Sequence, residues 1–461
     1  MGSPLGIRGA LYREQAGNAR RCNTPERAPG WGPGFVLTCL PDTCGVIAVK
    51  PADVVIVGAG IIGLSIAWQL ARRSALNILV LEKGAGTGEG STGASSAICR
   101  TRYSMDDMVQ LARDGIHAYR HWQAFTGLTS PRARFAQDGV LWMPGADTGW
   151  AEREHQRMQR LGVPSAVFGD AELSERYPAF SSCTRAPDVD TGAEHACRGG
   201  GRYFLETEGG YMDPVACADD LLEACRLAGV EVRFGAGVTD IQQTGGAVTG
   251  LRLADGESIT APCVVNAAGP WCNQLIAAAG LELPWRLTPT RIQVLYLDRP
   301  EELPGHIPVT VDMAAGIYFR CQNRGQQLVV GSVLESDEQE RVSEPDHFNR
   351  SADDDFTHAK LHALHHRLPA LPYRGPIRGY CGLYTVNEQD VHPLLGPTAL
   401  KGFYLANGFS GHGFKLAPAI GAMLARQITG DSCPDFDTAV DPRLFRVDRE
   451  PIRVDSKSVL A

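Results

Sequence analysis

Residues 54–82 read VVIVGAGIIGLSIAWQLARRSALNILVLE, and this stretch decides the fold of the chain. Four apolar residues precede three glycines in the spacing GxGxxG, namely Gly58, Gly60 and Gly63. A helical pattern then continues to about Arg73, and a second apolar run over 78–81 ends at Glu82. This order predicts one strand–helix–strand unit with the glycines at the first turn.

Each part of this unit has a physical role in binding a dinucleotide. The first glycine permits a tight turn, the second lets backbone approach a pyrophosphate, and the third lets the helix pack on the strand. The helix N-terminus directs the positive end of its dipole at the phosphates, and Glu82 can accept hydrogen bonds from ribose hydroxyls. We therefore expect FAD or NAD here, in preference to glycines that serve only a tight turn.

Composition narrows the classes of function. The chain has 461 residues, of which 44% are hydrophobic and 21% charged, which suits two intertwined domains of a globular protein. A net charge of −8 gives no overall positive field for nucleic acid, so a small-molecule partner is expected. The uncharged stretch 54–71 carries the glycine motif, so we expect no stable membrane insertion. Thirteen scattered cysteines without a CxxC pair indicate reduced thiols inside a cell.

The remaining pattern divides into two groups of elements. We expect the first group to return to the first sheet: a helix at 215–228 and strands at 230–234, 247–253 and 263–266. The second group is expected to form a mostly antiparallel sheet that can build a substrate wall: strands at 135–144, 291–297, 316–320 and 327–333. A last helix is expected from Gly413 to about Gln427.

Several further stretches carry a resemblance to a known family. They are GSTGASSAICRTRY (90–103), CVVNAAGPW (263–271), the region 381–417 with GLYTVNEQDVHPLLG and ANGFSGHGFKLA, and, more weakly, GGYMDP (209–214). Together with 54–82 they resemble the glutathione-reductase-type FAD fold, and in particular the D-amino-acid oxidase and sarcosine oxidase family. The nearest likeness is to sarcosine oxidase and dimethylglycine dehydrogenase-like members.

The resemblance implies an α/β fold in which a Rossmann-like FAD-binding domain is interleaved with a substrate domain built on a mostly antiparallel sheet. We expect 51–134, 203–285 and 378–435 to form the FAD-binding domain, and 135–202 and 286–377 the substrate domain. Residues 1–50 are expected to be a poorly ordered extension and 436–461 a C-terminal tail. The cofactor residues that motif and resemblance assign are Gly58, Gly60, Ile61, Ile62, Gly63, Glu82, Lys83, Ser91, Thr92, Ser95, Val238, Ala268, Gly269, Trp271, Gly382, Gly408, Gly411, His412, Gly413, Phe414 and Lys415.

The resemblance also assigns the substrate site. Lys415 is expected beside the flavin and a substrate carboxylate, with His412 near the ring. Arg100 is expected to bind that carboxylate in a bidentate manner, and Arg102 is an alternative for this role. Tyr318 and Tyr384 are expected as aromatic walls, the alternative for each being an ordinary core aromatic.

The implied reaction is FAD-dependent oxidation of a secondary or tertiary amino acid, such as sarcosine or dimethylglycine. Hydride passes to flavin N5, and water hydrolyses the imine product. A 2-hydroxy acid substrate is an alternative, and so is a flavoprotein assembly factor without catalysis. We expect cytoplasmic localisation, with the mitochondrial matrix as the alternative.

Departures from the family pattern refine these expectations. Gly382 occupies the position where some relatives attach FAD through cysteine, and the neighbouring Cys381 should point to the opposite strand face, so non-covalent FAD is favoured. Val329 matches the position where oxidases place a lysine that activates O2, and no lysine occurs between Lys83 and Lys360. This favours a dehydrogenase that passes electrons to an electron-transfer flavoprotein or a quinone rather than to O2, although an arginine or histidine could replace the lysine.

One segment looks like an insertion relative to the family. Residues 182–202 include Asp188, Asp190, His195 and Cys197. A polar surface loop is favoured over a metal site, so no metal is predicted.

Overall fold

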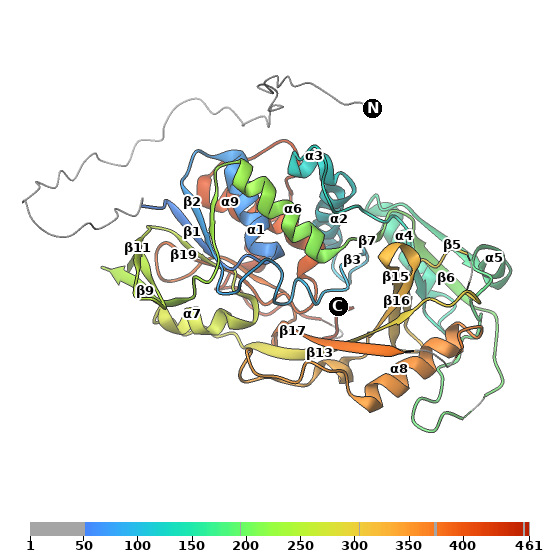
Figure 1. Cartoon of the computed structure of the whole chain (residues 1–461). Coiled ribbons are helices and arrows are strands. Elements are labelled where there is room, and N and C mark those ends of the chain that lie inside the picture. The colour runs from blue at the N-terminus through green and yellow to red at the C-terminus, as the bar shows by residue number, and fades with distance from the viewer. Residues whose placement is uncertain (1–50, 194, 304, 373–375, 455–456, 461) are drawn as a thin grey trace, which may run out of the picture.

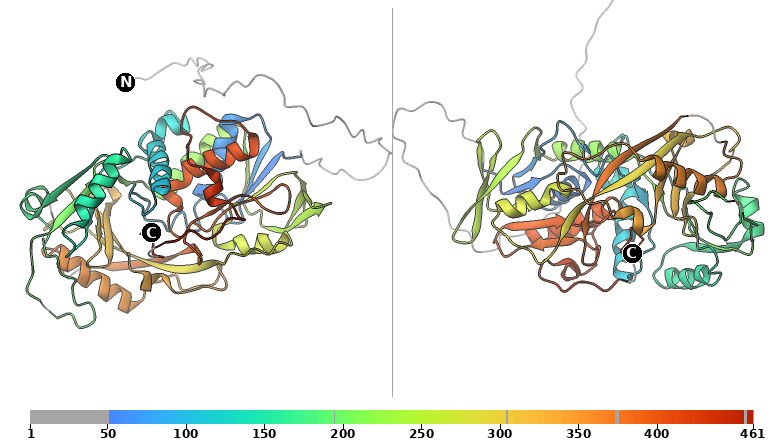
Figure 2. Two further views of the ribbon diagram at one scale, coloured as in Figure 1. Left: turned by 180° about the vertical axis from the view of Figure 1, so that it is seen from behind. Right: turned by 90° about the horizontal axis from the view of Figure 1, so that it is seen from below.

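A computed structural model describes residues 51–461 except 194, 304, 373–375, 455–456 and 461. The expected extension 1–50 therefore lies outside the described residues. Figure 1 shows two lobes: one carries α1, α6 and α9 beside a parallel sheet, and the other carries the long strands β13 and β17 with α8. Figure 2 shows from behind and from below that segments from both ends of the sequence contribute to the first lobe.

The first lobe is built on a six-stranded sheet in the order β18-β19-β12-β1-β2-β8. Its strands are β1 (Val54–Val57), β2 (Ile78–Leu81), β8 (Glu231–Arg233), β12 (Val264–Asn266), β18 (Leu394–Pro397) and β19 (Phe403–Asn407). All neighbours are parallel except β18, which runs antiparallel to β19. Every residue of β1 is buried, because layers cover both faces of a parallel sheet.

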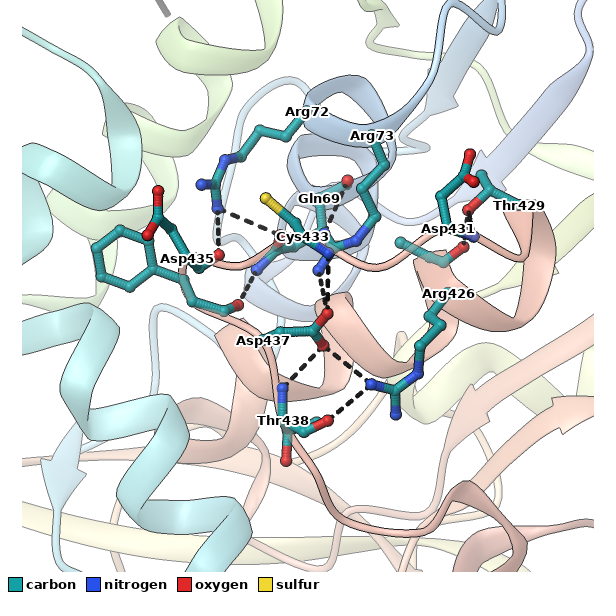
Figure 3. A network of polar contacts seen from close by, with 12 residues as sticks. Gln69, Arg72, Arg73, Arg426, Thr429, Asp431, Cys433, Asp435, Asp437 and Thr438 are labelled. Atoms are coloured by element: carbon teal, nitrogen blue, oxygen red, sulfur yellow. Dashed lines mark hydrogen bonds and ion pairs between the residues drawn. The ribbon is translucent and has the colours of Figure 1, made fainter. Parts of the chain in front are cut away.

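Helices cover one face of this sheet. They are α1 (Ile61–Arg73), α6 (Pro214–Leu227) and α9 (Gly413–Thr429), joined by α2 (Asp106–Arg120) and the short α3 (Trp122–Thr126). Helix α1 packs closely on α9 because Gly421 has no side chain: a Cβ there would lie 2.5 Å from the Ser65 carbonyl oxygen. Behind this contact, Asp437 forms ion pairs of 3.2 Å with both Arg73 and Arg426 (Figure 3). These ion pairs join the ends of α1 and α9 that lie away from the glycine turns.

The opposite face carries a separate three-stranded antiparallel sheet, β11-β10-β9, and the helix α7 (Cys272–Ala278). The expectation that 247–253 returns to the first sheet is therefore wrong. Strand β10 (Ala247–Leu253) forms a hairpin with β9 (Val238–Thr244) and pairs next with β11 (Ser258–Thr260). The reason is the turn Gly245–Gly246, where both residues have positive φ: a two-residue turn of this kind joins antiparallel neighbours only.

The second lobe is an eight-stranded sheet in the order β17-β13-β16-β15-β14-β4-β6-β5. Its strands are β4 (Val140–Met143), β5 (Ser165–Gly169), β6 (Arg202–Glu206), β13 (Leu287–Asp298), β14 (Val309–Asp312), β15 (Ile317–Gln322), β16 (Gln327–Ser332) and β17 (Ile377–Asn387). All neighbours are antiparallel except β4 and β14. Helix α8 (Asp354–Arg367) packs on one face, and α4 (Trp150–Arg160) and α5 (Asp170–Arg176) lie at the far edge (Figure 1).

The predicted fold class is confirmed: a Rossmann-like lobe is interleaved with a mostly antiparallel one. Strands β6 and β17, which the predicted boundaries group with the first domain, pair in the eight-stranded sheet. Strands β3 (Ile98–Cys99) and β7 (Gly210–Tyr211) form a small ladder between the lobes. Among the described residues, no helix is long and apolar enough to cross a membrane.

Candidate active site

A cavity of about 490 Å³ runs from the carboxyl ends of β1 and β2 to the second lobe. Its walls combine the glycine turn after β1, the segment 88–95, the turn after β12, and residues 409–414. Crevices at the carboxyl ends of parallel strands are where α/β folds bind ligands. The cavity therefore lies where the sequence motif predicts a nucleotide.

Glycine is required at the first turn for two reasons. Gly58 has φ +112°, and a Cβ there would lie 2.5 Å from the Ala267 carbonyl oxygen. A Cβ at Gly63 would lie 1.9 Å from the Gly58 carbonyl oxygen. The backbone of β12 and the start of α1 thus approach the turn so closely that no larger residue fits.

Two side chains organise the start of α1. Glu82 accepts hydrogen bonds from the backbone N–H groups of Ala59 and Gly84, each at 2.8 Å. Thr92 Oγ1 accepts one from Ile61 at 3.0 Å. Glu82 lines the cavity as a fixed acceptor at the end of β2. This is the place where a carboxylate meets the ribose of a bound dinucleotide.

The start of α9 forms the other end of the cavity. Helix α2 holds it there, since Tyr119 donates a 2.6 Å hydrogen bond to the Phe414 carbonyl oxygen and Gly115 allows close approach to Lys415. Gly413 and Phe414 line the cavity, and the N-cap residue of α9, His412, makes no side-chain capping hydrogen bond to a described residue. The positive end of the α9 dipole therefore faces the cavity.

A buried cationic pocket lies behind this wall. The side chains of Lys415 and Arg100 are almost fully buried, and the Arg100 guanidinium lies over the Tyr103 ring at 4.4 Å. Burial and then the charge of Arg100 lower the pKa of Lys415 to about 7. Two buried cations that both lie near the Tyr103 ring, Lys415 at 5.9 Å, favour an anion between them.

His412 precedes α9 and is fully buried. Its Nδ1 lies 3.1 Å from the Tyr103 hydroxyl, and its Nε2 has no hydrogen-bond partner among the residues that the structure describes. Burial, followed by the charges of Lys415 and Arg100, holds its pKa well below the ordinary value of 6.5. The imidazole is therefore neutral, and one of its nitrogens remains available to a bound group.

Strand β17 lines the cavity with Leu383, Tyr384 and Thr385. Tyr384 lines the cavity and packs on Gly411, where a Cβ would meet the tyrosine ring at 2.6 Å. Gly382 leaves room for Ala94 on the same strand face. Cys381 points the other way, and its Sγ lies 3.2 Å from the Ser351 carbonyl oxygen. The one-residue offset thus carries this thiol away from the cavity.

Two groups that the sequence analysis did not select lie beside the predicted tyrosines. Burial first, and to a lesser extent the charge of Glu338, raise the pKa values of Tyr318 and Tyr384, and burial raises the pKa of Glu338 itself to about 8. Arg320 is buried over the Tyr211 ring at 4.5 Å and stands directly opposite Val329 in the β15–β16 register. Arg320 could have been predicted, because it follows Tyr318 by two residues and side chains two apart on a strand share a face. Glu338 could not, because its acidic segment has no periodic pattern.

The C-terminal tail closes the pocket. Arg100 donates a hydrogen bond to the Val459 carbonyl oxygen, and Arg102 donates one of 3.0 Å to that of Leu460. The Val459 N–H donates to Glu338 Oε2 at 3.1 Å. Peptide groups of the tail therefore occupy the donors that the resemblance assigns to a substrate carboxylate.

The structure divides the predicted site residues into two sets. Those that line the cavity are Gly58, Gly60, Ile61, Ile62, Glu82, Lys83, Ser91, Thr92, Ser95, Val238, Ala268, Gly269, Trp271, Tyr384, Gly411, Gly413 and Phe414. Those that lie behind or beside its lining are Gly63, Arg100, Tyr318, Gly382, Gly408, His412 and Lys415. The two sets meet at the start of α9.

This geometry fits an FAD molecule. The glycine cradle, Glu82 and the N-terminus of α1 suit a nucleotide diphosphate. The N-terminus of α9, whose N-cap residue His412 makes no side-chain capping hydrogen bond, suits a flavin ring that gains negative charge. The His412 Nε2 atom, which has no hydrogen-bond partner among the described residues, lies at the same end of the cavity as the start of α9.

Comparisons with known proteins agree with this geometry. The family model described as "FAD dependent oxidoreductase" matches residues 53–427. The FAD-dependent oxidoreductase domain-containing protein 1 of Bos taurus is 27% identical, with 86% of this chain and 84% of that protein covered. Human peroxisomal sarcosine oxidase is 25% identical, with 87% and 96% covered. The structure of L-proline dehydrogenase from P. horikoshii superposes with a TM-score of 0.72 at 21% identity, covering 86% of this chain and 97% of that one.

Proposed function

Because the chain belongs to the FAD-dependent oxidoreductase family, we propose that it oxidises a secondary or tertiary amino acid of the sarcosine or dimethylglycine type. The observation that carries this proposal is the buried pair Arg100 and Lys415 beside Tyr384, which itself lines the cofactor cavity. When bound, FAD supplies a hydride acceptor.

The chain's own residues bind and orient the substrate. Arg100 and Lys415 hold its carboxylate, and the bidentate geometry of the guanidinium fixes its direction. Tyr318 and Tyr384 enclose the apolar part of the substrate and exclude water. A 2.5 Å hydrogen bond to Ser96 fixes the position of Tyr318. Glu338, protonated below about pH 8, holds a proton at the side of the tyrosines, where it can exchange with a substrate amine.

We further propose non-covalent FAD and an electron acceptor other than O2. The direction of the Cys381 side chain supports the first point. For the second, Val329 carries no charge, and Arg320 opposite it donates to the carbonyl oxygens of Ser96 and Cys321 and is not among the described residues that line the cavity. A positive charge near flavin N5 promotes reaction with O2, so reoxidation in air is expected to be slow.

The test follows the flavin absorbance anaerobically. N-methylated amino acids should bleach the visible band, whereas D-amino acids and 2-hydroxy acids should not, and air should restore it slowly. Lys415→Met should abolish bleaching while FAD remains bound, and the exposed Lys401→Met is the matched control. Bleaching by 2-hydroxy acids and not by N-methylated amino acids would show that the substrate is a 2-hydroxy acid. No bleaching by any compound would favour a flavoprotein without catalysis.

A second reading of the same experiment separates binding from catalysis. If the Lys415→Met variant no longer retains FAD, instead of retaining FAD that substrate cannot bleach, the assignment of Lys415 to the substrate carboxylate is wrong. Denaturation followed by filtration should release all flavin from the wild-type protein. Flavin retained by the denatured chain would contradict non-covalent binding.

A further inference from the structure

The loop 181–201, between α5 and β6, gathers metal-binding side chains at the outer edge of the second lobe, beside the end of α8 (Figure 1). The ligand atoms of Cys183, His195 and Cys197 all lie within 4.8 Å of one another. Cys183 Sγ and His195 Nε2 are 3.3 Å apart. Tetrahedral zinc, with Zn–S near 2.3 Å and Zn–N near 2.0–2.1 Å, places such a pair about 3.5 Å apart.

A candidate fourth ligand, His366, lies on α8 next to His195, outside the group of three whose ligand atoms lie within 4.8 Å of one another. The ring centroid of His366 lies 5.0 Å from that of His195. Its Nε2 is buried and has no hydrogen-bond partner among the described residues, while its ring donates a hydrogen bond to the backbone of Arg185. A histidine that binds zinc through one nitrogen is commonly oriented in this way through the other.

The surrounding backbone holds these side chains in place. The two limbs of the loop are joined because Thr184 N–H and Oγ1 both donate to the Arg198 carbonyl oxygen, at 2.8 and 2.9 Å. Arg367, next to His366, donates to the Cys183 carbonyl oxygen at 3.0 Å and forms a fully buried 2.6 Å ion pair with Asp312. The backbone at Cys183, Thr184 and Arg198 is therefore held by bonds that do not involve a metal.

We propose that Cys183, His195, Cys197 and His366 form a structural zinc site that fastens the loop to α8. Two thiolates and two imidazoles are a ligand set that selects Zn²⁺ by softness and by tetrahedral geometry. Binding releases the protons of the two thiols, and the two thiolates balance the charge of the ion. The prediction of a plain surface loop considered His195 and Cys197 but not Cys183 and His366, which only the fold brings to them.

The test measures zinc in the full-length protein purified without a histidine tag. We expect one zinc ion per chain in the wild-type protein and none in Cys197→Ser or His195→Ala. The control is Cys263→Ser, a half-buried cysteine on the other lobe, which should keep its zinc. All variants should keep their flavin absorbance, which shows that the first lobe is folded.

Two further measurements decide the ligand set. Replacing zinc by Co²⁺ should give a sulfur-to-cobalt charge-transfer band in the wild-type protein, and this band should weaken in Cys197→Ser. The His366→Ala variant should lose its zinc to a chelator more than ~10-fold faster than the wild type. Protein from zinc-supplemented cells that contains no zinc and binds no Co²⁺ would overturn the proposal. So would a Cys183–Cys197 disulfide, or zinc retained by both Cys197→Ser and His195→Ala.

Discussion

The burial of Lys415 beside Arg100 determines how this site responds to pH. Burial and the neighbouring guanidinium favour the neutral amine, so the pKa of Lys415 is lowered from 10.5 to about 7. The ammonium form is therefore present below about pH 7 and is lost above it. An anionic ligand restores the charge, because a carboxylate between the two groups favours the protonated form.

This predicts the pH dependence of carboxylate binding. Affinity for a carboxylate inhibitor such as acetate, followed by its perturbation of the flavin spectrum, should decline above about pH 7 by up to ~10-fold per unit. Lys415→Met should bind more weakly below pH 7 and lose the decline, and Lys401→Met should behave as wild type. An unchanged slope in Lys415→Met would contradict the assignment.

Glu338 predicts a change in stability. Burial raises its pKa from 4.5 to about 8, so between these values the folded state holds a proton that the unfolded chain releases. Stability should fall as pH rises through this window. Glu338→Gln should remove that part of the decline and raise the melting temperature by roughly 1–3 °C above pH 8. Scanning calorimetry measures this, with the exposed Glu344→Gln as control; a lower melting temperature at that pH would contradict it.

At the scale of elements, the starts of α1 and α9 form the two ends of the cavity, and neither N-cap residue, Gly60 or His412, makes a side-chain capping hydrogen bond. At α1 the Ile61 N–H is instead bound by Thr92, and glycines keep the approach to both helices open. The sequence predicted both helices and β1, β2 and β10 to within two residues, because each has a strong period or a glycine turn. It placed Gly382 and Cys381 on opposite faces of a strand, but it did not predict the pairing of β17 with β13, which brings Tyr384 to the cavity while Cys381 points away.

The glycine turn supplies a prediction at this scale. Gly58→Ala should abolish FAD retention, since its Cβ would collide with the Ala267 carbonyl oxygen and φ is +112°. Gly256→Ala is a matched control, because Gly256 has φ +92° but an added Cβ would meet no described atom within 4 Å. It should lower the free energy of unfolding by only about 1 kcal/mol and keep the flavin. The flavin-to-protein absorbance ratio measures both. Equal loss of flavin in the two variants would show that backbone strain, not the close approach, is responsible.

At the scale of the whole molecule, the proposed substrate pocket lies where the two lobes and the C-terminal tail meet. Arg100 and Lys415 come from the first lobe, Tyr318 and Glu338 from the second, and Val459 and Leu460 from the tail. On the proposed function, the tail would compete with the substrate carboxylate for the donors of Arg100 and Arg102.

Removing the tail should make the pocket more accessible. Deletion of 457–461 should lower the KM for the amino-acid substrate about 3-fold or more, because Arg100 and Arg102 no longer donate to peptide carbonyls. Deletion of residue 461 alone keeps Val459 and Leu460 and is the control. Steady-state kinetics measure the effect, and an unchanged or higher KM would show that the tail helps to build the pocket.

The sequence by itself determined the nucleotide-binding unit, the family and the cofactor, because glycine spacing, apolar runs and one acidic residue are local features whose geometry follows from short-range sterics and dipoles. Only the tertiary structure decided which distant groups meet. The tail reaches Arg100, Glu338 reaches Tyr384, and His366 reaches His195, through contacts between segments far apart in the chain. Such contacts depend on strand order and lobe packing, and no local periodicity encodes them.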